Sequence, residues 1–401
     1  MKRSARSIIL TILCGAMTAA AASCANGVTY PVTVDGEQFR AGMYILEQQT
    51  ALSEAVSKLS EEQPDLDTTA EDFDYFKQTV EGKSFDDWIK DTALEKCREY
   101  VAVERLFDQY GLTLSADEVN EINTNVKQLW TEENQYAQYY YGVSIIGEYY
   151  EKFGIGEQSF KDIQLNSRKR SDLFAFLYGE GGQLAATQDE INTSLQNDYL
   201  ALNYFVYELE NGDGAQSYAD SIASGKSYEE VYRDYSQAKS DEDAAKAAEE
   251  AAAAETENDE ETEDAAEEFD EGDELDDGGE TADDTTTQPT VIETAEKDSL
   301  IRILAKSSGT PSEEFISQAS AMNAGDVKVI TVENDSSTIT YVVQKLDILS
   351  LPEKTADTIA TIRSDLKTDE YSDMLKTTGA GYTLTTDSSI DLYKAKKLME
   401  S

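Results

Sequence analysis

Apolar residues recur three and four positions apart through much of the first half of the chain. This spacing places them on one face of a helix, which can then pack against a neighbouring helix. Three such helices are expected over residues 38–60, 84–109 and 158–178. The first half of the chain, residues 24–200, is therefore predicted to be a mostly helical domain.

Another helix is predicted to begin at Ser115, because Ser115 and Glu118 match the capping-box pattern. Its apolar stripe continues as far as Val143, with Glu133 as the one polar break, so we expect a single long helix that Gly154 and Gly156 end. The same capping pattern at Thr187 predicts a further short helix.

The pattern changes from residue 202 onward. Runs rich in β-branched and aromatic residues predict strands over residues 202–209, 300–304, 327–332 and 338–346. Helices are expected over residues 213–237, with a break at Gly225, over 311–322, and from Pro352 onward. The chain is therefore predicted to have an α+β fold, with a small sheet domain over 201–350 and a C-terminal helix and tail over 351–401.

An acidic segment interrupts the predicted sheet domain. Of the 44 residues from Asp241 to Asp284, 23 are Asp or Glu and only Lys246 is basic. Its first part, rich in Ala and Glu, can form a transient helix, but the remainder has too little apolar surface to fold. We expect a disordered insertion over residues 240–292. It is interpreted as a solvated spacer, with diffuse cation binding or docking of a basic partner as alternatives.

The N-terminal residues resemble a lipoprotein signal peptide. A short basic segment precedes an apolar run from Ile8 to Ala22, which is too short and too weakly apolar to span a membrane. Small residues then precede Cys24, similar to a bacterial lipobox, although Ala21 stands where Leu is usual. Cleavage after residue 23 and lipidation of Cys24 would hold the chain on the extracytoplasmic face of the cell membrane. The alternative is ordinary cleavage, with Cys24 as a bystander.

Composition excludes several classes of function. The net charge is -48, so nucleic acid is a poor partner, because phosphate binding needs clustered cations. The chain contains no histidine, which excludes Ser-His-Asp and Cys-His catalysis and histidine-ligated metal sites. No cofactor or metal is expected. Cys97 lies at helical spacing with apolar neighbours and is expected to be buried. Arg168, Lys169 and Arg170 are expected to form a solvated helix face, or alternatively to pair with the acidic segment.

Aromatic residues are concentrated between residues 130 and 150. Tyrosine offers a large contact area and a hydrogen-bonding end, and it loses little rotamer entropy on binding. Candidate residues for binding non-native chains are Trp130, Tyr136, Tyr139, Tyr140, Tyr141, Tyr149 and Tyr150. If Tyr136 and Tyr140 face the core, Tyr139 and Tyr141 point elsewhere. The alternative is that most of these side chains fill the helical core.

The layout resembles that of exported foldases of the PrsA and SurA type. The resemblance is carried by Val34–Phe39, Tyr228–Tyr232, Pro311–Phe315, Gly325–Val327 and the order of the predicted elements between 202 and 346. It implies a helical chaperone domain followed by a parvulin-like prolyl isomerase domain with an antiparallel sheet. It also implies that the C-terminal helix and tail pack back on the N-terminal domain.

The chain departs from the parvulin pattern at its catalytic positions. Tyr204 and Tyr341 stand where the family carries histidines, and Phe315 matches an aromatic residue of the proline pocket. The resemblance therefore implies a membrane-anchored foldase or holdase for unfolded or partly folded secreted polypeptides, with a degenerate isomerase site. The alternatives are an active parvulin-type prolyl isomerase, and a structural or solute-binding lipoprotein with a fixed partner.

Overall fold

The described part of the chain forms two compact units. The computed structural model describes residues 28–68, 70, 73–210, 214–258, 300–334 and 337–396. One unit contains the residues up to Ala186 together with those from Arg363 on, and the other contains Thr187–Ile362. The division after Ala186 differs from the predicted boundary at residue 200, because the short helix after Thr187 belongs with the sheet. The predicted signal peptide and Cys24 lie outside the described residues.

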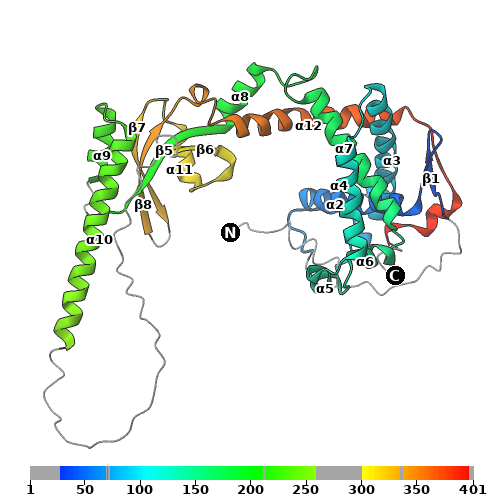
Figure 1. The fold of residues 1–401 in the computed structure, drawn as a ribbon, viewed down its shortest axis with the longest axis horizontal. Helices are drawn as coiled ribbons and strands as arrows, with labels where there is room; N and C mark the ends of the chain where they lie inside the picture. Colours follow the sequence, from blue (N-terminus) through cyan, green and yellow to red (C-terminus); the bar gives the residue numbers. More distant parts are fainter. Residues whose placement is uncertain are drawn as a thin grey trace, which may run out of the picture. The chain divides into compact units, whose positions relative to one another are not determined.

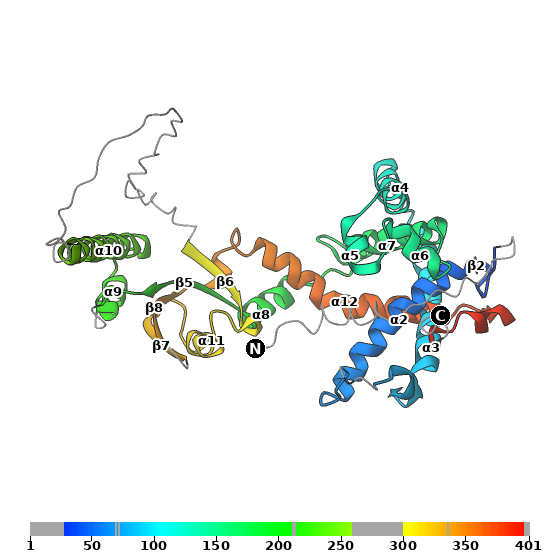
Figure 2. The same cartoon turned by 90° about the horizontal axis from the view of Figure 1, so that it is seen from below.

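The first unit is mainly helical (Figures 1 and 2). Its helices are α2 (Ala41–Glu62), α3 (Phe85–Gln109), α4 (Ala116–Thr131), α5 (Gln135–Tyr141), α6 (Ile146–Lys152) and α7 (Glu157–Tyr178). The unit boundary falls within α12 (Ala356–Ala380). The bounds of α3 and α7 are within one residue of those predicted. Helix α2 begins at Ala41 rather than at 38, because residues 37–39 form a strand.

Small sheets support these helices. Strands β1 (Val32–Val34) and β2 (Glu37–Phe39) form a hairpin whose turn residues, Asp35 and Gly36, both have positive φ angles, of 48° and 88°. Strand β9 (Leu384–Thr386) pairs antiparallel with the other edge of β1. A second hairpin joins β3 (Thr79–Val80) to β4 (Lys83–Ser84). The short 3₁₀ segments of this unit are η1 (Tyr75–Lys77) and η5 (Ser388–Leu392).

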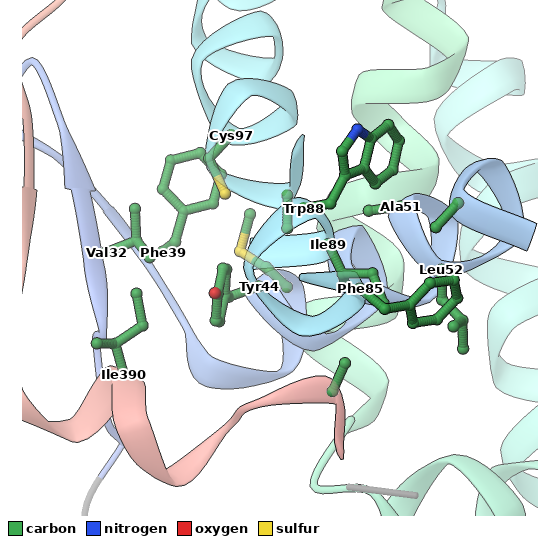
Figure 3. Close-up of a cluster of buried hydrophobic side chains, with 14 of the residues drawn as sticks. Val32, Phe39, Tyr44, Ala51, Leu52, Phe85, Trp88, Ile89, Cys97 and Ile390 are labelled. Carbon is green, nitrogen blue, oxygen red and sulfur yellow. The ribbon is translucent and has the colours of Figure 1, made fainter. Parts of the chain in front are cut away.

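The main core of this unit lies where α2, α3 and the β1 hairpin meet (Figure 3). Phe39, Tyr44, Phe85 and Ile89 are fully buried there, and burial of each phenylalanine or isoleucine side chain contributes about 1.5–3 kcal/mol. Cys97 is fully buried among them, which confirms its prediction as a small apolar side chain. Burial also raises the pKa of its thiol.

The single long helix predicted from Ser115 to the glycines at 154 and 156 is wrong, because this stretch forms α4, α5 and α6. Helix α4 ends at Thr131, Glu132 is extended, and α5 begins afresh at Gln135. Asn134 starts the new helix, because its Oδ1 accepts hydrogen bonds from the backbone N–H groups of Tyr136 and Ala137. The break occurs at the polar position that interrupted the apolar stripe.

The three consecutive basic residues of α7 each pair with a glutamate of a neighbouring helix. Arg168 pairs with Glu118 of α4, whereas Lys169 and Arg170 pair with Glu104 and Glu99 of α3. The side chains of Arg168 and Arg170 remain 45% and 40% exposed, which agrees with the predicted solvated face. Their partners are glutamates of α3 and α4, and most of the acidic segment named in the alternative lies outside the described residues.

The second unit is built on an antiparallel sheet in the order β6-β5-β8-β7. The strands are β5 (Tyr199–Tyr207), β6 (Ile301–Ala305), β7 (Val327–Asn334) and β8 (Ser337–Lys345). The helices are α8 (Gln188–Asp198), α9 (Gly214–Ala223), α10 (Tyr228–Asn258) and α11 (Glu313–Ser320), and the 3₁₀ segments are η3 (Lys306–Ser308) and η4 (Ile348–Ser350). Helix α11 covers one face of the sheet, whereas α9 and α10 cover the other (Figure 2). The structure therefore has the predicted α+β character.

Helix α10 extends into the acidic segment. The predicted start of disorder at residue 240 is wrong, because the helix continues to Asn258. Salt bridges one helical turn apart join Lys239 to Asp243 and Lys246 to Glu242, and such pairs stabilise a solvated helix. The rest of the predicted insertion lies outside the described residues. Among the helices that the structure describes, none is both long and apolar enough to cross a membrane.

Candidate functional site

Three neighbouring tyrosines project into solvent from the short helix α5. The exposed fractions of Tyr136, Tyr139 and Tyr140 are 66%, 82% and 52%. The rings of Tyr139 and Tyr140 meet edge to face, with centroids 4.9 Å apart. Exposed aromatic side chains grouped in this way are a feature of surfaces that bind other proteins. The idea that Tyr136 and Tyr140 face the core is wrong, because Ala137 is the residue of α5 that is buried.

The orientation of α5 is fixed at both ends. Asn134 caps its first turn, at 2.8 Å from the N–H of Tyr136 and 3.2 Å from that of Ala137. At the other end, Gly142 has a φ of 65°, a left-handed conformation that glycine adopts without strain. The backbone N–H of Asn134 also donates to the carbonyl oxygen of Ser144, at 2.9 Å. These contacts hold a helix of only two turns in place.

The other aromatic candidates form the layer that supports this surface. Trp130 stacks on Tyr150, with centroids 5.8 Å apart, and its Nε1 donates to Glu151 at 3.0 Å. Tyr141 and Tyr149 lie 4.4 Å apart between their centroids. All four aromatic side chains are half-buried, and burial raises the pKa of Tyr150. The structure thus separates the predicted residues into an exposed group and a supporting group.

Two grooves beside the tyrosines are lined mainly by amides and carboxylates. One is lined by Glu133, Asn134, Gln135, Tyr136, Gln138 and Ser144. The other is lined by Asn125, Gln128, Leu129, Glu132, Glu133, Asn134 and Ile146. Sequence reasoning missed these amides, because exposed Asn and Gln on a helix look like ordinary solvated residues. Their density between 125 and 138 was the one available signal.

In the second unit, the three predicted isomerase-site residues lie together. The ring of Phe315 is 5.1 Å from that of Tyr204 and 4.7 Å from that of Tyr341, centroid to centroid. Phe315 is completely buried and Tyr341 is 5% exposed, because both pack between the sheet and α11. The three rings therefore fill this region with their own side chains. Among the described residues, no group of carboxylates and thiols is placed to hold a metal ion.

A separate groove follows β5 beyond the point where β6 stops pairing with it. Its lining includes Tyr204, Tyr232, Tyr235, Lys239 and Arg302. The Tyr235 hydroxyl donates to the carbonyl of Val206 at 2.8 Å and accepts from the N–H of Glu208 at 3.1 Å. The Tyr235 hydroxyl therefore forms hydrogen bonds with backbone groups at the edge of β5 that would otherwise be free to pair with another strand.

Comparison with known proteins gives little further guidance. No protein-family model matches the chain. No curated protein matches it either. A solved structure, the 3.10 Å crystal structure of the foldase protein PrsA from Lactococcus lactis, is 12% identical. The match covers 91% of this chain and 99% of that chain with a TM-score of 0.29. This similarity is too distant to support a function, which we therefore infer from the chain's own residues.

Proposed function

We propose that the protein is a holdase that binds non-native segments of secreted polypeptides on the surface formed by Tyr136, Tyr139 and Tyr140. The observation that carries this proposal is the high exposure of three neighbouring tyrosines on one short helix, fixed by its cap and its glycine. A folded protein rarely leaves grouped aromatic side chains in water unless they contact a partner.

Tyrosine suits clients of varied sequence. Its ring offers apolar contact, and its hydroxyl bonds to any exposed backbone group, so recognition depends little on client sequence. The ring of Tyr140 lies 6.5 Å from that of half-buried Tyr141, which packs on Tyr149. This contact restricts the exposed ring and so reduces the conformational entropy lost on binding.

Anchoring through Cys24 is part of the same proposal. A basic segment, an apolar run and small residues before a cysteine support lipid modification at that position. Diacylation supplies two acyl chains, enough for stable attachment. Intact-mass measurement of membrane-extracted protein should show a lipid adduct that Cys24→Ser abolishes. An unmodified wild-type chain would contradict anchoring and leave the holdase proposal standing.

The holdase proposal is tested by the aggregation of a reduced disulfide protein, followed by light scattering. The purified protein should suppress aggregation, and the Y136S/Y139S/Y140S variant should lose most of that effect. Each substitution keeps a hydroxyl but removes the ring, so the lost effect reports aromatic contact. Circular dichroism should show unchanged helix content, because the three rings lie outside the core.

A matched control removes three exposed apolar side chains elsewhere. Val28, Leu349 and Leu392 are 62%, 39% and 64% exposed. The V28S/L349S/L392S variant should suppress aggregation as well as the wild type. Equal loss in both variants would mean that general surface apolarity, rather than the α5 surface, holds the client.

Prolyl isomerisation is not part of the proposed activity. An isomerase needs an accessible pocket that binds a twisted amide better than a planar one. Phe315 and Tyr341 are buried against each other instead. Refolding limited by proline isomerisation should therefore not be accelerated. Acceleration that Phe315→Ala abolishes would replace this part of the proposal with an active isomerase.

A further inference from the structure

Two carboxylates lie beside the exposed tyrosines without a cationic partner. Glu132 and Glu133 occupy the break between α4 and α5, and both are exposed. Within the described ranges neither forms an ion pair, whereas each of the three consecutive cations of α7 does. Glu133 lines both grooves and Glu132 lines one of them. The carboxylates of Glu132 and Glu133 therefore place negative charge directly at the proposed client surface.

The tyrosine faces add to this preference for positive charge. An ammonium or guanidinium group is attracted to the face of an aromatic ring, and exposed Tyr136 lines a groove together with Glu133. A cation placed there can contact the ring face and the carboxylate together. Gln135 and Gln138 line the same groove and can bond to an extended peptide backbone through their amide donors and acceptors.

We propose that the surface formed by Glu132, Glu133 and Tyr136 selects extended client segments that carry lysine or arginine beside aromatic or apolar residues. This inference rests on the proposed holdase function and names the class of client. Charge complementarity indicates which kind of partner binds this surface. A second copy of this chain, with a net charge of -48, or an acidic peptide would be repelled, and a neutral peptide would gain only the tyrosine contacts.

The test measures the binding of three labelled unstructured peptides by fluorescence anisotropy. The peptides have the same length and the same phenylalanine positions, and carry lysine, glutamine or glutamate at matched sites. The lysine peptide should bind the purified protein roughly fivefold to tenfold more tightly than the glutamine peptide, the range expected for partly exposed ion pairs with a cation–π contact. The E132Q/E133Q variant should reduce this preference to within about twofold without weakening the glutamine peptide.

A matched control separates a local site from the general charge of the chain. Glu61 and Asp65 are exposed at the end of α2 and in the loop that follows, and neither forms an ion pair among the described residues. The E61Q/D65N variant removes the same charge and should keep the preference for lysine. Equal loss of preference in both variants would overturn the inference, because long-range attraction would then explain the binding. A preference that persists in E132Q/E133Q would overturn it as well.

The results also separate this inference from the holdase proposal. Equal binding of all three peptides, lost in Y136S/Y139S/Y140S, would overturn cationic selection and leave the holdase standing. No binding of any peptide, together with no suppression of aggregation, would overturn both.

Discussion

The carboxyl group of Glu47 is held in an unfavourable environment between three helices. Burial raises its pKa from 4.5 to about 7, and the charges of Glu99 and Glu54 act in the same direction. Lys96 and Arg170 oppose this shift, but each already pairs with another carboxylate, Lys96 with Glu54 at 2.6 Å and Arg170 with Glu99. Glu47 is therefore the acid in this cluster that gains most from remaining protonated.

The raised pKa makes the stability of the first unit depend on pH. Because the folded state holds the Glu47 proton more tightly than the unfolded state, its contribution is complete below about pH 4.5 and is lost as the pH rises through about 7. The difference between 4.5 and about 7 corresponds to at most about 3.4 kcal/mol, at about 1.36 kcal/mol per pH unit. Glu47 is only partly buried, so water screening reduces this to about 2 kcal/mol.

Replacement of Glu47 by glutamine should remove this dependence. The variant should match the wild type near pH 4.5 and be more stable by about 2 kcal/mol at pH 8, because its amide cannot ionise. Urea unfolding followed by tryptophan fluorescence reports on this unit specifically, since both tryptophans, Trp88 and Trp130, lie within it. Glu61→Gln, at an exposed position of the same helix, is the control and should change stability little at either pH. A Glu47→Gln variant no more stable than the wild type at pH 8, or a difference that does not change with pH, would refute the reasoning.

Three further substitutions test contacts seen in the two units. Lys345→Met should lower the free energy of unfolding of the second unit by about 2 kcal/mol, as measured by thermal melts. The reason is that the Lys345 Nζ donates to three carbonyl oxygens at the end of α11, the shortest at 2.6 Å. Unchanged stability would show that these three hydrogen bonds do not stabilise the end of α11. Gly147→Ala should cost about 1–3 kcal/mol and shift the emission of Trp130, since a Cβ there would lie 2.7 Å from the indole. Asn134→Ala should cost about 1 kcal/mol, speed amide hydrogen exchange in α5 and weaken holdase activity, whereas Asn134→Asp should preserve all three. Identical exchange rates in Asn134→Ala and the wild type would show that the cap does not hold α5.

Local signals in the sequence predicted much of the secondary structure. The capping patterns at Ser115 and Thr187 both form complete capping boxes in the structure. Strands β5 and β8 were predicted within three residues at each end, because runs rich in β-branched and aromatic residues favour a strand over a helix. The family resemblance, rather than a local pattern, implied that Tyr204 and Tyr341 belong to one site, and their ring centroids lie 6.0 Å apart.

Other features depend on contacts that no local pattern carries. The apolar stripe from Val119 to Val143 is periodic, but the side chain of Asn134 competes for the backbone and starts a new helix. Once the phase is reset, Ala137 becomes the buried position and the tyrosines turn outward. The grooves depend on this turn, so neither they nor the isolated charges of Glu132 and Glu133 could be predicted from spacing.

The pairing of β9 with β1 determines when the first unit can be completed. A chain synthesised from its N-terminus presents β1 early, but its second strand partner is made only after the whole second unit. At about 5–20 residues per second this delay is on the order of tens of seconds. During that interval one edge of β1 stays open and the core lacks Ile390 and Ala395. A chain truncated before residue 384 would keep the open edge of β1 permanently. The three-stranded sheet therefore forms only in chains whose synthesis has continued through β9.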